Sequence, residues 1–137
     1  MILNDNNKDY KIQVYTCALM IIIASADENL EAEEIDVIKD IISDFYSLEI
    51  EIIEKIMNDA QIVINDSIDI YQIASFINKE LSKQDKIDLI YCIFEIAYSD
   101  NNLHFMEKHL IDKIANIFNL NKSEIFKAKK EIQKYLQ

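Results

Sequence analysis

The sequence predicts an all-α protein, and two observations carry that prediction. The 137 residues include no glycine and no proline, whereas an average chain contains about 7% and 5% of them. Tight β-hairpins depend on glycine for positive φ angles, and many turns depend on proline. The apolar residues also recur at helical spacing between short connections rich in Asn, Asp and Ser. We therefore expect one helical domain, residues 1–137, with about seven helices.

The first half of the chain predicts three helices. The first, at about 8–26, is apolar almost all round its second half, which indicates a central position in the core. The second, at about 31–46, has one apolar stripe with the spacing of a single buried face. We expect Ser47 to be the N-cap of the third helix, 48–63. The side chains expected to point inward from that helix are Ile52, Ile53 and Ile56.

The second half predicts a linking helix and three more. These helices are expected at about 68–81, 83–99, 104–118 and 124–136. Ser82 and Asp85 resemble a capping box at the start of the fifth helix, and Asn121 and Glu124 form a capping-box pattern before the seventh. Short polar connections of this kind favour helices that pack against their sequence neighbours.

An eight-residue block, Asp-x-Asn-Leu-x-x-x-Glu, occurs twice, at Asp27–Glu34 and at Asp100–Glu107. Around it, seven of nineteen aligned positions are identical between the copies, which lie 73 residues apart. Each copy follows an apolar helix and opens an amphipathic one. We therefore expect two pseudo-symmetric helical hairpin repeats, about 10–63 and 83–136, that share one core and are joined by the helix at about 68–81.

Helix structure alone explains part of the block. Asn29 and Asn102 suit helix N-caps, and Leu30 and Leu103 would then point into the core. The aspartate that opens each copy partly suits the turn after the preceding helix. The final glutamate of each copy is not explained in this way, because it stands two residues beyond the position that completes a capping box.

Glu34 and Glu107 can instead reach back toward Asp27 and Asp100 of their own copies. Two carboxylates that are brought together repel each other unless a proton, a cation or a basic group lies between them. We therefore predict that these four residues bind a divalent metal ion. Ligands that are all oxygen atoms favour Ca²⁺, Mg²⁺ or Mn²⁺.

Neither copy is a complete calcium-binding loop. The Asp and Glu spacing matches the second half of an EF-hand loop, whose last Glu is a bidentate ligand, but Ile23 and Ile96 stand where the first acid would be. Binding therefore requires that the two repeats bring their acids together. His104 is either an additional ligand next to Glu107 or an exposed helix residue.

Net charge limits the partners that the protein can bind. The formal charge is −11, with twelve acidic residues and two lysines between residues 27 and 59. Such a surface repels phosphate backbones and argues against nucleic acid. The alternative to cation binding is an acidic scaffold that docks a basic protein partner or a membrane-associated complex. We find no nucleophile–base pair and no phosphate-binding loop, so we expect no catalytic activity and no organic cofactor.

The cysteines and the apolar runs indicate a cytoplasmic protein without membrane insertion. Cys17 and Cys92 lie in apolar helical runs and form no CxxC motif, so we expect reduced core thiols. The longest apolar run, 14–26, is shorter than the ~20 residues that span a bilayer. The N-terminus lacks the pattern of a signal peptide.

Residues 23–34 and 96–107 resemble the two repeated motifs of the tellurite-resistance TerB family, apolar-Ala-x-x-Asp-Gly-x-apolar-x-x-x-Glu, which the N-terminal domain of the DjlA co-chaperones shares. The resemblance extends over about 10–130. It implies a pseudo-symmetric bundle of about seven helices, a role in stress and tellurite resistance with links to membrane-associated assemblies, and metal binding by the four acidic motif residues. The chain departs from the pattern at Glu28 and Asn101, which replace the glycine after each aspartate.

Overall fold

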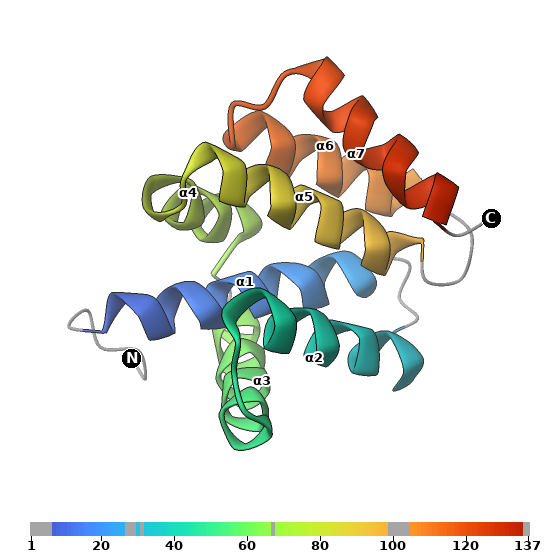
Figure 1. Ribbon diagram of the computed structural model, residues 1–137. Helices are drawn as coiled ribbons and strands as arrows, with labels where there is room; N and C mark the ends of the chain where they lie inside the picture. Colours follow the sequence, from blue (N-terminus) through green and yellow to red (C-terminus); the bar gives the residue numbers. More distant parts are fainter. Residues whose placement is uncertain (1–6, 27–29, 31, 67, 99–104, 136–137) are drawn as a thin grey trace.

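A computed structural model describes residues 7–26, 30, 32–66, 68–98 and 105–135. Within these ranges the chain forms seven α-helices and no strand (Figure 1). Their bounds are α1 (Lys8–Ala24), α2 (Ala32–Tyr46), α3 (Ile50–Asn65), α4 (Ile70–Glu80), α5 (Lys83–Ala97), α6 (Phe105–Ile117) and α7 (Lys122–Tyr135). The all-α class and the order of the helices are confirmed, and every helix end lies within two residues of its predicted position.

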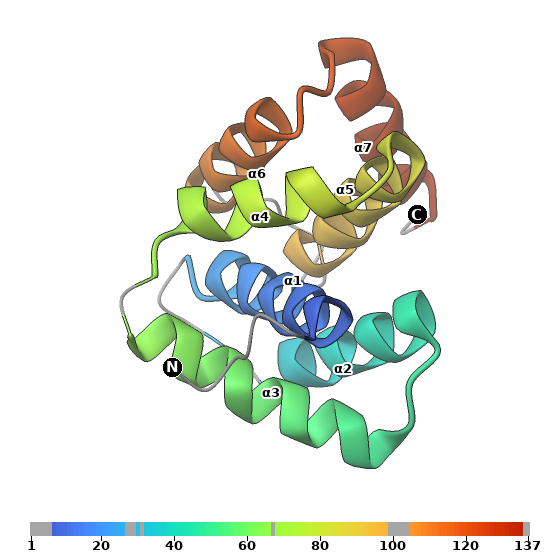
Figure 2. The same ribbon diagram turned by 90° about the vertical axis from the view of Figure 1, so that its left-hand side faces the viewer.

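The first helix, α1, is the centre of the molecule. It crosses the middle, with α2 and α3 on one side and α4 to α7 on the other (Figures 1 and 2). It packs against all of the helices from α2 to α6. Because its second half is apolar all round, it can meet neighbours on every side, and the run from Val14 to Ile21 is entirely buried. The predicted central position is confirmed.

The two halves of the chain use the same helix order. In the first, α1 packs on α2 and α3; in the second, α5 packs on α6 and α7, and α4 links the halves by contacts with α1 and α6. One difference is visible in Figure 2: α2 and α3 pack against each other, whereas α6 and α7 diverge from the turn that joins them. The predicted pseudo-symmetry of the two repeats stays a prediction.

The predicted capping box of α7 is present, and at α5 the Ser82 half of the predicted box is present. The backbone amide of Asn121 donates to Glu124 Oε1 (3.0 Å), and the Glu124 amide donates to Asn121 Oδ1 (2.8 Å), which is a reciprocal capping box. At α5 the amide of Asp85 donates to the hydroxyl of Ser82 (3.1 Å). These bonds satisfy amides that the helix itself leaves without partners.

Two predictions for α3 are wrong. Ser47 is not its N-cap, because Ser47 has a left-handed backbone (φ 54°) and belongs to the end of α2. There the Leu48 amide donates to the carbonyl of Ser43 (3.1 Å), as in a Schellman motif. The N-cap of α3 is Glu49. Ile52 is 41% exposed, since the buried stripe of the helix passes beside it.

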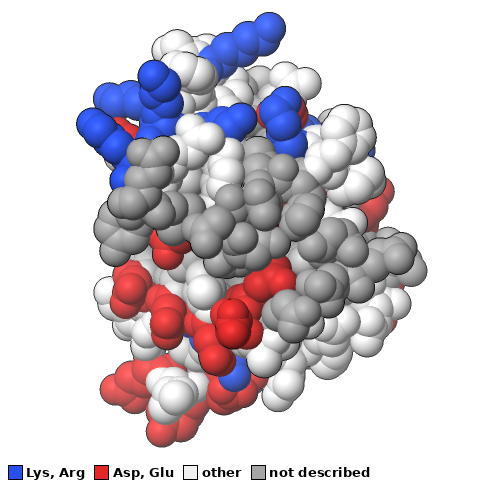
Figure 3. Space-filling model, turned by 90° about the vertical axis from the view of Figure 1, so that its right-hand side faces the viewer, with Lys and Arg blue, Asp and Glu red and all other residues white. Residues whose placement is uncertain are grey.

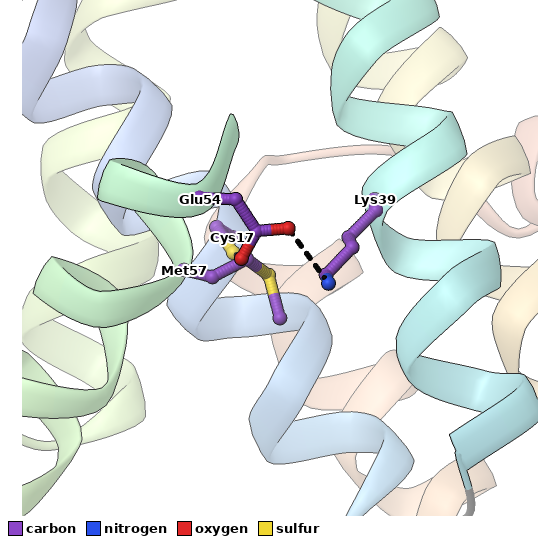
Figure 4. Close-up of polar contacts among 4 residues, drawn as sticks. All are labelled: Cys17, Lys39, Glu54 and Met57. Atoms are coloured by element: carbon purple, nitrogen blue, oxygen red, sulfur yellow. Dashed lines mark hydrogen bonds and ion pairs between the residues drawn. The ribbon is translucent and has the colours of Figure 1, made fainter. Parts of the chain in front are cut away.

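Both cysteines are free thiols, as predicted. Cys17 is buried where α1 meets α3, and its Sγ lies 3.3 Å from Met57 Sδ (Figure 4). Burial raises the pKa of Cys17, and of the half-buried Cys92, to about 12. In the same view Lys39 of α2 forms an ion pair with Glu54 of α3, with a distance of 2.9 Å between Nζ and Oε1.

Candidate functional site

The described residues that flank the two motif copies lie at one end of the molecule. The C-terminal ends of α1 and α5 and the N-terminal ends of α2 and α6 are all on the right-hand side of Figure 1. In Figure 2, turned by 90°, the same four ends lie on the far side. This follows from the helix order, because α1 and α5 run in the same direction across the molecule and α2 and α6 return from it.

The predicted metal ligands divide into two described and two undescribed residues. Glu34 lies in the first turn of α2 and is half-buried. Glu107 lies in the first turn of α6 and is 2% exposed. Asp27 and Asp100 lie outside the described residues, as does His104. The structure therefore places one glutamate from each copy on helices that start at the same end.

In the first turn of α6 the apolar residues are exposed and the charged residue is buried. Phe105 is 80% exposed and Met106 is 49% exposed, whereas Glu107, the next residue, is buried. Apolar side chains are usually the buried ones, and a buried carboxylate is costly unless it is hydrogen-bonded or paired. Within the described ranges, Glu107 is the one buried residue that carries a charge. A helix stabilised only by core packing would have the opposite arrangement.

Leu30 also departs from the prediction. It was expected to point into the core, but it is 37% exposed, and the corresponding Leu103 lies outside the described residues. Leu30 is therefore not part of the buried core.

This end of the molecule is divided by charge. In Figure 3, which faces it, Asp and Glu gather on the lower half, over α2 and α3, and Lys gathers on the upper half, over α6 and α7. Residues 1–66 contain 15 acidic residues and 4 lysines, whereas residues 67–137 contain ten of each. The first half therefore carries the whole net charge, and its field attracts cations and basic groups.

Carboxylates also crowd the contact between α2 and α5. Burial raises the pKa of the Glu95 carboxyl above its ordinary value, and the nearby Asp44 carboxylate raises it further. Tyr46, on the same side of α2, has a pKa raised to about 12 by burial, and its hydroxyl lies 2.8 Å from Thr16 Oγ1. Desolvation therefore favours the neutral forms of Glu95 and Tyr46 at this contact.

The described part of the chain does not contain a complete metal site. No group of three or more His, Cys, Asp or Glu side chains within it has an arrangement that could hold a metal ion. His109 is exposed on α6. A full set of ligands around Glu34 or Glu107 therefore requires acids from the undescribed parts of the motifs, and the sequence offers Asp27 and Asp100. Such a set of oxygen atoms suits a hard divalent cation.

The comparisons with known proteins agree with the resemblance of the motifs. The family model described as tellurite resistance protein TerB matches residues 13–130. A search of the curated proteins and a search of the solved structures gave no match. Among the described helices none is both long and apolar enough to cross a membrane. Because the matched region covers most of the chain and includes both copies of the motif, the protein belongs to the TerB tellurite-resistance family.

Proposed function

We propose that this protein is a non-catalytic, cytoplasmic module of the stress and tellurite response that binds a divalent cation through Asp27, Glu34, Asp100 and Glu107. The observation that carries the proposal is the first turn of α6. There a motif carboxylate is buried while the two apolar residues before it are exposed. Core packing does not explain the burial of a carboxylate at this position. Glu34 and Glu107 each stand at the third position of their helix, where a glutamate can also cap the helix start.

A cation at this place would link the two halves of the chain. Glu34 belongs to α2 in the first half and Glu107 to α6 in the second, and both helices start at the same end of the molecule. An ion bound by both would offset the repulsion between their carboxylates. Because it would bind the folded chain and not the unfolded one, it would also raise the melting temperature.

Calorimetric titration tests this function. Mn²⁺, Ca²⁺ and Mg²⁺ are titrated separately into the wild-type protein, into Asp27→Asn/Asp100→Asn, and into Asp40→Asn/Asp44→Asn. The last variant is the control, because it removes the same charge from exposed positions of α2 outside the motif. We expect binding by the wild type and the control, with a rise in melting temperature, and neither effect in the motif variant. The absence of heat with all three ions, or an equal loss in the control, would contradict the proposal.

A second candidate function is a scaffold that docks a basic protein partner or a membrane-associated complex without metal. The acidic surface of α2 and α3 in Figure 3 favours it. A fluorescent lysine-rich peptide is the probe, in the presence of EDTA. Binding should weaken with added salt and with Lys substitutions at Glu49, Glu51 and Glu54, which are all exposed. Binding that responds to neither change, or no binding, would count against this candidate.

A further inference from the structure

A groove separates α6 from α7 on the side of the molecule away from α1. The two helices diverge from their shared turn (Figure 2), and a hollow of about 480 Å³ lies between them. Apolar side chains line it, and three lysines stand among them. The lining residues include Phe94, Leu120 and Phe126, and the three lysines are Lys108, Lys122 and Lys129. Volumes of this size are typical of sites that bind a ligand or an anchor side chain.

The chemistry of the groove favours an occupant that is both apolar and acidic. Phe126 remains 59% exposed although it borders the groove, and Phe94 beneath it is buried. Asp112 also lines the groove, but it is 3.5 Å from Lys108, so the other two lysines have no acid within the groove to balance them. In a chain of net charge −11 this is a local positive surface, and an acidic segment gains most from it.

The start of α3 has the complementary chemistry. Ile50 is 70% exposed, and the exposed acids Glu49 and Glu51 stand on either side of it in the chain. Glu54 follows one turn later and is also exposed. A single exposed isoleucine is ordinary. Glu54 pairs with Lys39 of the same chain, so the two glutamates that flank Ile50 are the acids that the lysine-rimmed groove can meet.

We propose that the α6–α7 groove binds the start of α3 of a second copy of this chain. Ile50 of one copy enters the apolar part of the groove, and its flanking glutamates meet Lys122 and Lys129 of the other. The contact joins two different surfaces, so it is heterologous, and it extends from copy to copy unless the rotation closes a ring. The proposal goes beyond cation binding and uses neither Glu34 nor Glu107.

Sedimentation equilibrium with EDTA tests the proposal without contribution from metal. The protein is measured over rising concentration in about 20 mM salt and again in about 0.5 M salt, where the Debye length falls from roughly 20 Å to about 4 Å. At low salt we expect the weight-average mass to rise at least twofold above the 16.1 kDa of one chain. At high salt it should return toward that of the monomer.

Three variants locate the contact. Lys122→Glu/Lys129→Glu reverses the charge of the groove, and Glu49→Lys/Glu51→Lys reverses the charge at the start of α3. Each variant alone should stay monomeric. An equimolar mixture of the two should associate again, because each variant retains the surface that the other has lost. Lys8→Glu/Lys79→Glu is the control, since it makes the same change of net charge on α1 and α4. It should associate like the wild type.

A monomer at every concentration in low salt would overturn the proposal. So would association that survives reversal of the charge of the groove. A symmetric dimer that is insensitive to Glu49→Lys/Glu51→Lys would also overturn it, because the occupant would then not be α3. Melting curves of each variant establish that it is folded. A negative result here leaves the calorimetric test of cation binding unaffected, because the two tests use different residues and opposite metal conditions.

Discussion

The first half of the molecule, α1 to α3, and the second half, α5 to α7, follow the same helix order. They differ in the burial of their helices and in their charge. α1 has an uninterrupted buried run and packs against five other helices, whereas α5 starts with exposed residues and its buried residues are interrupted by half-buried ones. Residues 1–66 carry the whole net charge, and α2 and α3 pack together. In residues 67–137 the charges balance, and α6 and α7 enclose a groove.

The motif glutamates of the two halves also differ in burial. Glu34 and Glu107 hold equivalent places in the first turns of α2 and α6, but Glu34 is half-buried and Glu107 is buried. The two halves differ in core, charge and packing, while the acids recur in both. The two glutamates share the third position of a helix, and they differ in how deeply they are buried.

The largest expected effect concerns the central position of α1. Leu19 is fully buried in α1, and the equivalent position in α5 is Cys92, which is half-buried. We expect Leu19→Ala to lower the free energy of unfolding by about 3–5 kcal/mol, because it leaves a cavity at the centre of the core. Cys92→Ala should cost about 1 kcal/mol or less. Urea unfolding measures both; equal losses would mean that α1 is no more central than α5.

The second effect concerns the motif glutamates themselves. Glu107→Ala should lower the free energy of unfolding by about 1–3 kcal/mol, because it removes a buried polar group from its partners. Glu34→Ala, at a half-buried position, should cost less than about 1 kcal/mol. Thermal unfolding in EDTA is the measurement. A larger loss of stability in Glu34→Ala than in Glu107→Ala would contradict this prediction, because burial would then not determine the cost of losing the glutamate.

The third effect concerns how α2 and α6 end without glycine. Ser47 after α2 and Asn119 after α6 both have left-handed backbones, with φ of 54° and 57°. Glycine adopts this conformation without steric cost, and asparagine tolerates it better than serine. We expect Ser47→Gly to raise the free energy of unfolding by about 0.5–1 kcal/mol, and Asn119→Gly to raise it less. A loss of stability in Ser47→Gly would contradict this account of the α2 terminus.

The smallest effect is a pH dependence along α2 and α5. Burial, followed by the charge of Asp44, raises the pKa of Glu95 in the folded state above its unfolded value. The folded state therefore holds this proton more tightly, and the stability it provides is lost as pH rises through the folded pKa. Glu95→Gln should raise the melting temperature at pH 7, and the gain should vanish below about pH 4. A gain that is independent of pH would exclude this cause.

Helix periodicity and the absence of glycine and proline were sufficient to predict the fold, because each helix has an apolar stripe that its neighbours cover. Helix ends were harder to predict. The Asn121–Glu124 box is recognisable by its spacing, whereas the Asp69–Gln72 box at the start of α4 was not predicted. Ser47 was assigned to the wrong helix, since serine suits an N-cap better than a left-handed C-terminal position.

The candidate site was only partly predictable. The recurrence of the glutamates pointed to Glu34 and Glu107, but no periodicity could reveal that α6 begins with Phe105 exposed and Glu107 buried. The apolar pattern alone would predict that Phe105 is buried and that Glu107 is exposed. The α6–α7 groove could not be predicted from the sequence either, because it arises from the angle between two helices whose sequences have no unusual feature.

The most direct test of the central claim is the stoichiometry of Mn²⁺ binding in Glu34→Gln and Glu107→Gln, measured one at a time by calorimetry. If one ion is shared between the two halves, the wild type binds a single ion, and either substitution abolishes binding together with the metal-dependent rise in melting temperature. Two independent sites, with each substitution removing half of the binding, would contradict a shared ion. Binding that neither substitution changes would show that the motif glutamates do not bind the cation.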